Sequence, residues 1–432
     1  MSTSQQPRSV LTRRPVIAWA LYDWANSAFA TTVMAGFFPV FFKEYWNTGV
    51  VATESTFRLG LMNGISAALI ALLAPVLGAI ADRSSSRVRM LLMVTVLGCA
   101  ATAGLALVGQ GHWVGAVLLY LLASLGFWGG IVFNDSLLLH VAEPDEYDVV
   151  SGFGYSLGYL GGGLLFAVNV WMTLDPQLFG FAGAGEAVRA SFVMVGIWWL
   201  VFALPCVLVV KERKSVSAVP PVEAIRQGLR ELRNTLVELR SYRPVLWFLA
   251  AYFLYIDGVN TVIKMAVDYG LSLGFGPAGL MKALLLTQFV AFPAALAFGW
   301  LGRRIGARRG IFLALLVYAG VTCYAYFIET ARDFYVLAVA VGLVQGGIQS
   351  LSRSYFGRLV PEGKSSEFFG FYNMMGKFAA VLGPLLMAVT ARLTGDSRLS
   401  ILSLIVLFVA GGTLLVVASR AERRAASVSA GR

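Results

Sequence analysis

Charged residues are scarce in this chain. Of its 432 residues, 58% are hydrophobic and only 13% are charged, whereas a soluble globular protein carries about 25% charged residues. Apolar stretches long enough to cross ~30 Å of hydrocarbon recur along the whole sequence. They are continuous, and do not alternate with polar residues as barrel strands do. The composition therefore predicts an all-α integral membrane protein.

Cysteine and histidine are also rare. The three cysteines are far apart, and the two histidines form no cluster with them; these residues are Cys99, Cys206, Cys323, His112 and His140. Because metal sites and disulfide frameworks need clustered ligands, we expect no metal, no cofactor and no disulfide. The sequence has no GxxxxGK[ST] motif and no concentrated set of His, Asp, Glu or Ser, so neither an ATP-driven pump nor an enzyme is predicted.

The apolar segments number twelve. We expect membrane spans at about 16–42, 58–81, 88–109, 113–140, 150–173, 190–210, 244–267, 280–301, 308–328, 333–359, 367–391 and 398–419. The first is too long for a signal peptide and is expected to be retained as a span.

Basic residues fall mainly in alternate loops. Roughly two dozen of the 34 Lys and Arg would lie on one side, which predicts that both termini are cytoplasmic in a bacterial inner (plasma) membrane. This bias accounts for the net charge of +11 without a nucleic-acid partner. One loop on that side, Glu143 to Asp148, is acidic. It could latch onto a basic helix at 222–240 or onto the loop of Arg303 and Arg304.

One long polar connection divides the chain. It predicts an N-terminal bundle over 1–210, a linker over 211–243 and a C-terminal bundle over 244–432. Within the linker, apolar residues recur at helical spacing, with arginines on the other faces. An amphipathic helix on the inner leaflet and a solvated linker helix are both compatible with this pattern, and its role is left open.

Several motifs occur twice. Gly78, which precedes Asp82 and Arg83, corresponds to Gly299 at a separation of 221 positions, and Gly152-Phe153 corresponds to Gly370-Phe371 at 218. In the first and seventh spans, Asp23 and Asn26 correspond to Asp257 and Asn260. The repeats predict two six-helix halves in parallel orientation.

These motifs also resemble a known family. The loop from Gly78 through Asp82 to Arg87 resembles the major facilitator signature between helices 2 and 3, with Arg303 at the acidic position of a degenerate second copy. The segments Tyr22–Phe29, Ser151–Gly163 and Ser352-Arg353-Ser354 are similar to the vacuole effluxer (autophagy-related) branch and its bacterial relatives. The resemblance covers essentially all twelve helices. It implies a transporter, and the fungal members are described as amino-acid effluxers.

Carboxylates within spans mark the candidate site, because an ionisable group at the bilayer centre usually faces a water-filled cavity or a partner. Asp23, next to Tyr22, shares a helix face with Asn26, and Asp257 shares one with Asn260. The resemblance implies that helices 1, 4, 7 and 10 line a central cavity, where these patches would bind solute and one carboxylate would take up a proton. Hydrogen bonding that holds the halves together is the alternative.

Other polar residues in the spans extend this candidate site: Asn134, Lys264, Gln345, Gln349, Arg353, Asn373 and Lys377. Arg353 could grip a substrate carboxylate through two parallel hydrogen bonds or act in a gate. Lys264 could pair with such a carboxylate or reach the outer surface. Asn373 and Lys377 would border the cavity, pack between helices or meet lipid headgroups.

The repeated loops predict a gate. Asp82 would lie at the N-terminus of a neighbouring helix and close the cytoplasmic side in one state, or act as a static clasp. The remaining gate candidates are Gly78, Arg83, Arg87, Arg303, Arg304 and Gly306. In related transporters an acidic residue at the end of helix 4, here Asp135, pairs with an arginine of the loop after helix 2.

We therefore expect a secondary transporter that moves a small polar solute, such as an amino acid, by alternating access. Efflux and proton coupling are open points. The expected partners are the solute and the bilayer, and the expected state is a monomer. A lipid or lysolipid translocator of the same fold and a non-transporting membrane sensor are the alternatives.

Overall fold

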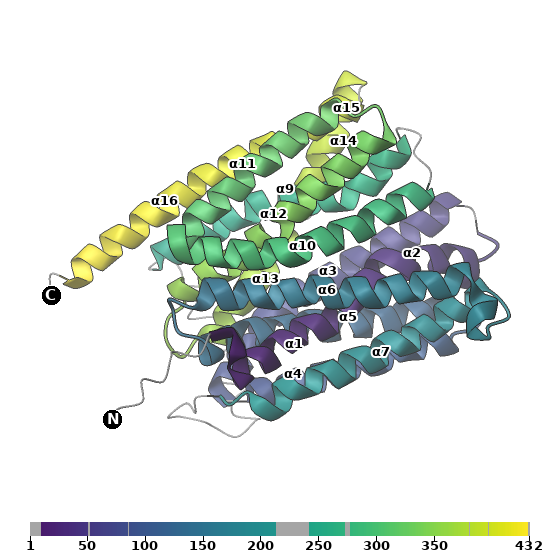
Figure 1. Ribbon diagram of the computed structural model, residues 1–432, viewed down its shortest axis with the longest axis horizontal. Helices are drawn as coiled ribbons and strands as arrows, with labels where there is room; N and C mark the ends of the chain where they lie inside the picture. The colour runs from purple at the N-terminus through teal and green to yellow at the C-terminus, as the bar shows by residue number, and fades with distance from the viewer. Residues whose placement is uncertain are drawn as a thin grey trace, which may run out of the picture.

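The computed structural model describes residues 10–430 except 51, 85, 213–241, 273–276, 380 and 396. All regular secondary structure in these ranges is helical. The long helices run side by side along one direction (Figure 1). The predicted linker helix at 222–240 lies outside the described residues.

The N-terminal half contains six spans. Its elements are η1 (Val10–Thr12), α1 (Arg14–Ala28), η2 (Phe29–Phe37), α2 (Phe38–Phe41), η3 (Phe42–Trp46), α3 (Ala52–Ser84), α4 (Arg87–Gly104), η4 (Leu105–Leu107), α5 (Trp113–Val141), α6 (Tyr147–Leu174), η5 (Pro176–Phe179) and α7 (Ala184–Val209). The first span runs continuously from α1 to η3, with η2 and η3 wound as π-helix.

The C-terminal half contains the other six. Its elements are α9 (Arg243–Ser272), α10 (Pro277–Ile305), α11 (Ala307–Tyr326), α12 (Ala331–Leu359), α13 (Ser365–Phe378), α14 (Leu382–Thr394), α15 (Ser397–Leu402) and α16 (Ile405–Ala430). One span is divided between α13 and α14. Pro384 lies in the first turn of α14, where its missing N–H costs no intrahelical hydrogen bond.

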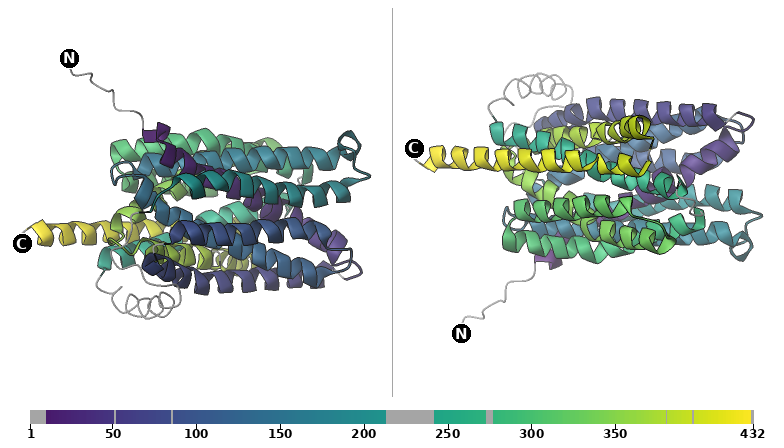
Figure 2. Two further views of the ribbon diagram at one scale, coloured as in Figure 1. Left: turned by 90° about the horizontal axis from the view of Figure 1, so that it is seen from below. Right: turned by 90° about the horizontal axis from the view of Figure 1, so that it is seen from above.

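Twelve helical segments among the described residues are long and apolar enough to cross a bilayer. The prediction of twelve spans is confirmed. Figure 2 shows that α1 begins and α16 ends at the same end of the bundle. The loops at Arg87 and at Arg303 also lie there, and we call this end the basic end.

The two halves meet chiefly along two pairs of helices, α3 with α13 and α6 with α10, and α12 also packs on α6 and α13 on α5. A Cβ atom on Gly370 would lie 2.7 Å from the carbonyl oxygen of Ala74, and one on Gly152 would lie 2.8 Å from that of Ala295. These two contacts correspond under the repeat found in the sequence. The predicted pseudo-symmetry of the halves is therefore present at their interface, where glycine permits close packing.

Candidate functional site

Arg353, two turns before the end of α12, connects the two halves. Its Nε donates to Oγ of Ser151 at 2.8 Å, and its Nη2 donates to the Ser151 carbonyl oxygen at 3.0 Å. Its Nη1 donates to Oδ2 of Asp23 at 3.1 Å and to Oδ1 of Asp135 at 3.0 Å. One guanidinium thus holds α12 to α1, α5 and α6. We call Arg353, Asp23, Asp135 and Ser151 the inter-half lock.

Aromatic rings surround the guanidinium. The Cζ atom of Arg353 lies 4.8 Å from the ring centroid of Trp19 and 4.3 Å from that of Tyr155, and the residue is only 2% exposed. A cation over a ring face is attracted most strongly where water is excluded. A Cβ at position 154 would lie 2.4 Å from Oδ2 of Asp23, so Gly154 leaves the room that the lock needs.

Two asparagines complete the hydrogen bonding of the carboxylates. Asn134 Nδ2 donates to Oδ1 of Asp23 at 3.1 Å, and Asn373 Nδ2 donates to Oδ2 of Asp135 at 3.0 Å. Each of the four carboxylate oxygens therefore accepts a hydrogen bond. The Asp23 side chain is 14% exposed and that of Asp135 is 4% exposed, so Asp23 is the more accessible of the two.

The charges of the lock do not balance. Two carboxylates share one guanidinium, which leaves one surplus negative charge when both are ionised. An uncompensated charge in a low-dielectric interior is costly. The lock can therefore take up one further positive charge, such as a proton or an ammonium group.

Asp257 and Asn260 lie at the break between α13 and α14. The Asp257 carboxylate accepts from the backbone N–H of Leu382 at 2.9 Å and of Gly383 at 2.8 Å, and Asn260 Nδ2 donates to the carbonyl oxygen of Ala379 at 3.0 Å. The N–H groups of a first helical turn have no intrahelical acceptor. In this structure the predicted polar patch of the seventh span satisfies the backbone of the interrupted span.

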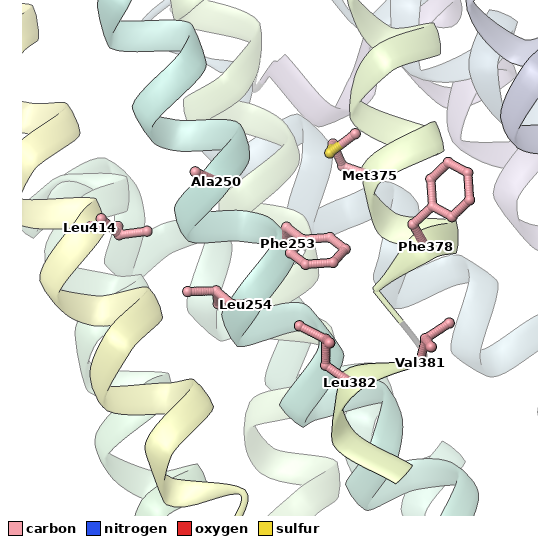
Figure 3. Close-up of a pocket in the computed structure, with 8 residues that line it drawn as sticks. All are labelled: Ala250, Phe253, Leu254, Met375, Phe378, Val381, Leu382 and Leu414. Carbon is pink, nitrogen blue, oxygen red and sulfur yellow. The ribbon is translucent and has the colours of Figure 1, made fainter. Parts of the chain in front are cut away.

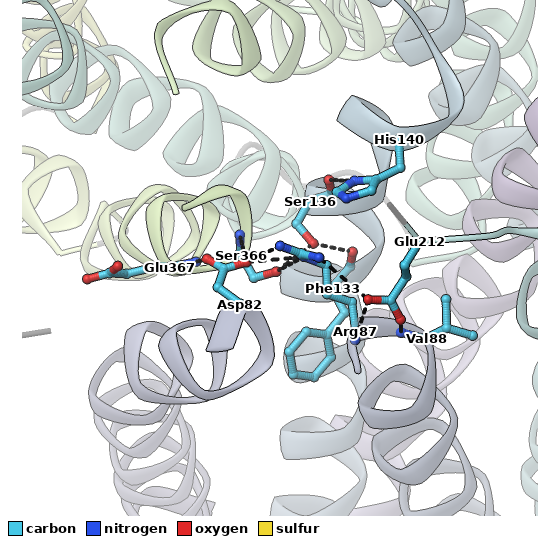
Figure 4. A network of polar contacts seen from close by, with 9 residues as sticks. All are labelled: Asp82, Arg87, Val88, Phe133, Ser136, His140, Glu212, Ser366 and Glu367. Carbon is cyan, nitrogen blue, oxygen red and sulfur yellow. Dashed lines mark hydrogen bonds and ion pairs between the residues drawn. The ribbon is translucent and has the colours of Figure 1, made fainter. Parts of the chain in front are cut away.

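Asp82 lies at the N-terminus of α13, as Figure 4 shows. Its carboxylate accepts from the backbone N–H of Ser366 at 3.0 Å and of Glu367 at 2.8 Å, and Arg87 Nη2 donates to it at 2.6 Å. A negative charge is stabilised at this end of a helix. A Cβ at Gly78 would lie 2.2 Å from the Ser366 carbonyl oxygen, so glycine allows this approach. The contact joins α3 of one half to α13 of the other.

Glu212, just after α7, extends this network (Figure 4). Its Oε1 accepts from the backbone N–H of Val88 at 2.7 Å, and its Oε2 accepts from that of Arg87 at 3.0 Å. It therefore caps the N-terminus of α4. Asp135 was expected to pair with an arginine of this loop. In this structure Arg87 pairs with Asp82 and Glu212, whereas Asp135 pairs with Arg353.

The acidic loop that precedes α6 and the start of α6 hydrogen-bond two basic residues, one from each half. Asp148 accepts from Ser354 Oγ and, at 2.9 Å, from Arg358 Nη1, and Arg13 donates to Glu146. Burial raises the pKa of Glu146, but the Glu143 amide and the guanidinium groups of Arg13 and Arg303 outweigh it, so the pKa lies below its ordinary value. The side chains that hydrogen-bond Asp148 and Glu146 thus come from α12 and from the residue before α1. Arg303 acts on Glu146 only through its positive charge.

A model of the vacuole effluxer Atg22-like proteins matches residues 45–427. The chain belongs to this family.

The Atg22-like chain has bacterial and fungal relatives. It is 40% identical over 400 residues to the uncharacterized MFS-type transporter YxiO of Bacillus subtilis, a match that covers 92% of this chain and 93% of that protein. It is 26% identical over 287 residues to autophagy-related protein 22-2 of Aspergillus clavatus. That match covers 60% of this chain and 46% of the fungal protein, so the chain spans about half the length of this relative.

A solved structure shows the same fold. The human organic anion transporter MFSD10 has a TM-score of 0.72 at 17% identity, over 95% of this chain and 100% of that one. The Atg22-like chain is thus an integral multi-pass membrane protein of the major facilitator superfamily, and its relatives identify it as a transporter.

Other candidates of the Atg22-like site are buried or half-buried in the spans. Tyr22 is buried, with its hydroxyl 3.0 Å from Oγ1 of Thr95, and Asn26 is buried with its Nδ2 unpaired among the described residues. Gln345 contacts Tyr159, and Gln349 is half-buried. Lys377 lies over the ring of Trp128.

The second of the two repeated loops differs from the first. Arg303 and Arg304 are exposed at the end of α10, and Gly306, with φ at 88°, allows the turn into α11. The side chains of Lys264 and Arg83 lie outside what the structure describes.

Sequence reasoning missed several residues of these networks, among them Trp19, Ser151, Tyr155, Glu212 and Arg358. Ser151 and Tyr155 lie in a segment that carries the family resemblance, which was a usable signal. Nothing in the sequence indicated Trp19 or Glu212.

Proposed function

We propose that this protein exports a small polar solute bearing an amino group, such as an amino acid, in exchange for protons. The observation that supports the proposal is the lock, in which Asp23 and Asp135 share the single guanidinium of Arg353.

Alternating access would require the lock to open. Rocking of the two halves separates α12 from α1, α5 and α6 at the basic end, and Arg353 then leaves both carboxylates. The two carboxylates would remain inside the membrane without a counter-charge. A proton or the ammonium group of a solute would neutralise one of them, so the two cations compete at Asp23, the more exposed carboxylate.

The proposed direction rests on the orientation that the basic loops favour. Basic loops face the cytoplasm, so we place the basic end and both termini on the cytoplasmic side of the bacterial plasma membrane. In this orientation, the inter-half contacts of Arg353 and Asp82 hold the cytoplasmic side closed. A solute that binds from the cytoplasm would be released outside when these contacts reform, and protons would return through the same site.

The test is exchange in proteoliposomes. Vesicles loaded with radiolabelled amino acids and subjected to a proton gradient should lose label faster with the wild-type protein than without it. Asp23→Asn should remove the gradient-driven component, because it removes the charge for which the two cations compete. Asp175→Asn, the same change at an exposed position, should behave as wild type.

Two results would overturn the proposal. One is export by Asp23→Asn with an unchanged response to the gradient. The other is movement of a fluorescent lysolipid without movement of any amino acid, which would identify a lipid translocator instead.

A further inference from the structure

An apolar groove lies on the C-terminal half, between α9, α13, α14 and α16. Figure 3 shows the eight side chains that line it: Ala250, Phe253, Leu254, Met375, Phe378, Val381, Leu382 and Leu414. Its volume is about 730 Å³, within the range of pockets that hold drug-sized ligands. All eight residues are apolar, and Phe378 and Val381 are 42% and 59% exposed. The groove is thus open to the surroundings of the bundle.

The groove runs from the leaflet at the basic end to about the centre of the bilayer. All of its residues belong to membrane spans. Ala250 to Leu254 lie about 10 to 17 Å along α9 from Arg243, at 1.5 Å per residue, and one leaflet contributes about 15 Å of hydrocarbon. A polar ligand would find no hydrogen-bonding group among the lining side chains, whereas an acyl chain of the leaflet at the basic end reaches this depth.

A positive charge lies above the groove. Arg243 begins α9 and is exposed. Positions seven and eleven residues further on a helix return to nearly the same face, so Arg243 stands on the face of α9 that carries Ala250 and Leu254. Its guanidinium is suited to pair with a phosphate group. An anionic phospholipid offers a match for both features: its acyl chain suits the apolar groove, and its phosphate suits the cation at the interface.

The deep end of the groove is the break between α13 and α14. Val381 and Leu382 line it, and the backbone N–H of Leu382 is held by Asp257 from the α9 side. Asp257 and Asn260 satisfy backbone groups at this break from within the protein, as irregular backbone in the hydrocarbon region requires. An acyl chain can therefore lie against the break without leaving those groups unpaired.

We propose that the groove binds one acyl chain of an anionic phospholipid whose phosphate pairs with Arg243. This site lies outside the inter-half lock, and its occupancy does not depend on which solute is transported.

The test measures bound lipid directly. Purified, delipidated protein is mixed with dioleoyl-phosphatidylglycerol and examined by native mass spectrometry and thermal unfolding. The wild type should retain one lipid, and the lipid should raise its melting temperature, because a ligand of the folded state stabilises it. Ala250→Trp, which fills the groove, and Arg243→Gln should each reduce retention about tenfold, equivalent to about 1.4 kcal/mol.

Matched controls distinguish lipid binding in the groove from non-specific lipid contact with the rest of the protein surface. Leu316→Trp on α11 and Arg309→Gln at its start change exposed residues away from the groove and should retain lipid as the wild type does. If Ala250→Trp does not fold, Leu414→Trp fills the same groove from α16. Equal retention and equal stabilisation in the groove variants and controls would overturn the proposal. A change in oligomeric state with unchanged lipid binding would also do so, because it would identify a second copy as the occupant.

Discussion

Nη1 of Arg353 and Oδ1 of Asp135 lie 3.0 Å apart, although the two residues belong to opposite halves of the bundle. Both are almost fully buried. Removing one partner of such a pair leaves the other charge without compensation, whereas removing both does not. The contact thus stabilises one arrangement of the halves and opposes their separation.

Arg353→Gln should destabilise the folded protein by about 3–5 kcal/mol, because two carboxylates would then lack a counter-charge. Adding Asp135→Asn should recover part of that loss. Chemical denaturation in detergent measures both effects. The pairing would be contradicted if the double variant lost more folding free energy than the two single variants lose in total.

Gly383→Ala should lower the melting temperature. A Cβ there would lie 2.0 Å from Oγ1 of Thr261 and 2.8 Å from Oδ1 of Asp257, so the cap of α14 would be displaced. Loss of such a cap costs about 0.5–2 kcal/mol. Gly320→Ala is the matched control, because a Cβ on that helical glycine meets nothing within 4 Å. Equal melting temperatures would show that the cap contributes nothing.

Asp82→Ala should open the basic end, because the first backbone N–H groups of α13 would lose their acceptor. The measurement is the alkylation rate of a cysteine introduced as Ser136→Cys, a buried position beside Ser366, in protein whose native cysteines are replaced. We expect a severalfold faster rate. Asp145→Ala, at an exposed position, should leave it unchanged, and the absence of any difference between the two would refute the gate.

Glu146→Gln should remove a pH-dependent contribution to stability. The pKa of Glu146 is lower in the folded protein than in the unfolded chain, so its stabilisation is present above the unfolded value of about 4.3 and is lost as pH falls through the folded value. The difference in melting temperature between wild type and variant should therefore be greatest at neutral pH and vanish in acid. A constant difference from pH 7 to pH 3 would contradict this origin.

Much of the fold followed from the sequence. Continuous apolar runs predicted the twelve spans, and repeated glycine motifs predicted two related halves. The break in the eleventh span was not predicted. Gly383-Pro384 was visible, but its effect depends on the carboxylate of Asp257, which lies more than a hundred positions earlier.

The candidate site was predicted less completely. Asp23, Asp135, Arg353 and Asn373 were identified because polar groups are rare in spans, and the structure brings them together. Their pairing depends on how the two halves meet, which single-helix periodicity does not encode. Asp23 and Asp257 occupy equivalent positions in the repeat, yet one bonds a guanidinium and the other a helix terminus. Their neighbours on the opposing helices cause this difference.

The two pairs of helices at the interface therefore respond differently to the solution around them. At α3 and α13, a buried carboxylate meets backbone amides, where mobile ions do not reach. On the α6 side, Arg358 of the inter-half ion pair with Asp148 is partly exposed, and ion pairs in such positions are screened by salt. Raising the ionic strength should weaken the contact on the α6 side and leave that between α3 and α13 nearly intact. The two sides of the interface between the halves thus differ in their dependence on salt.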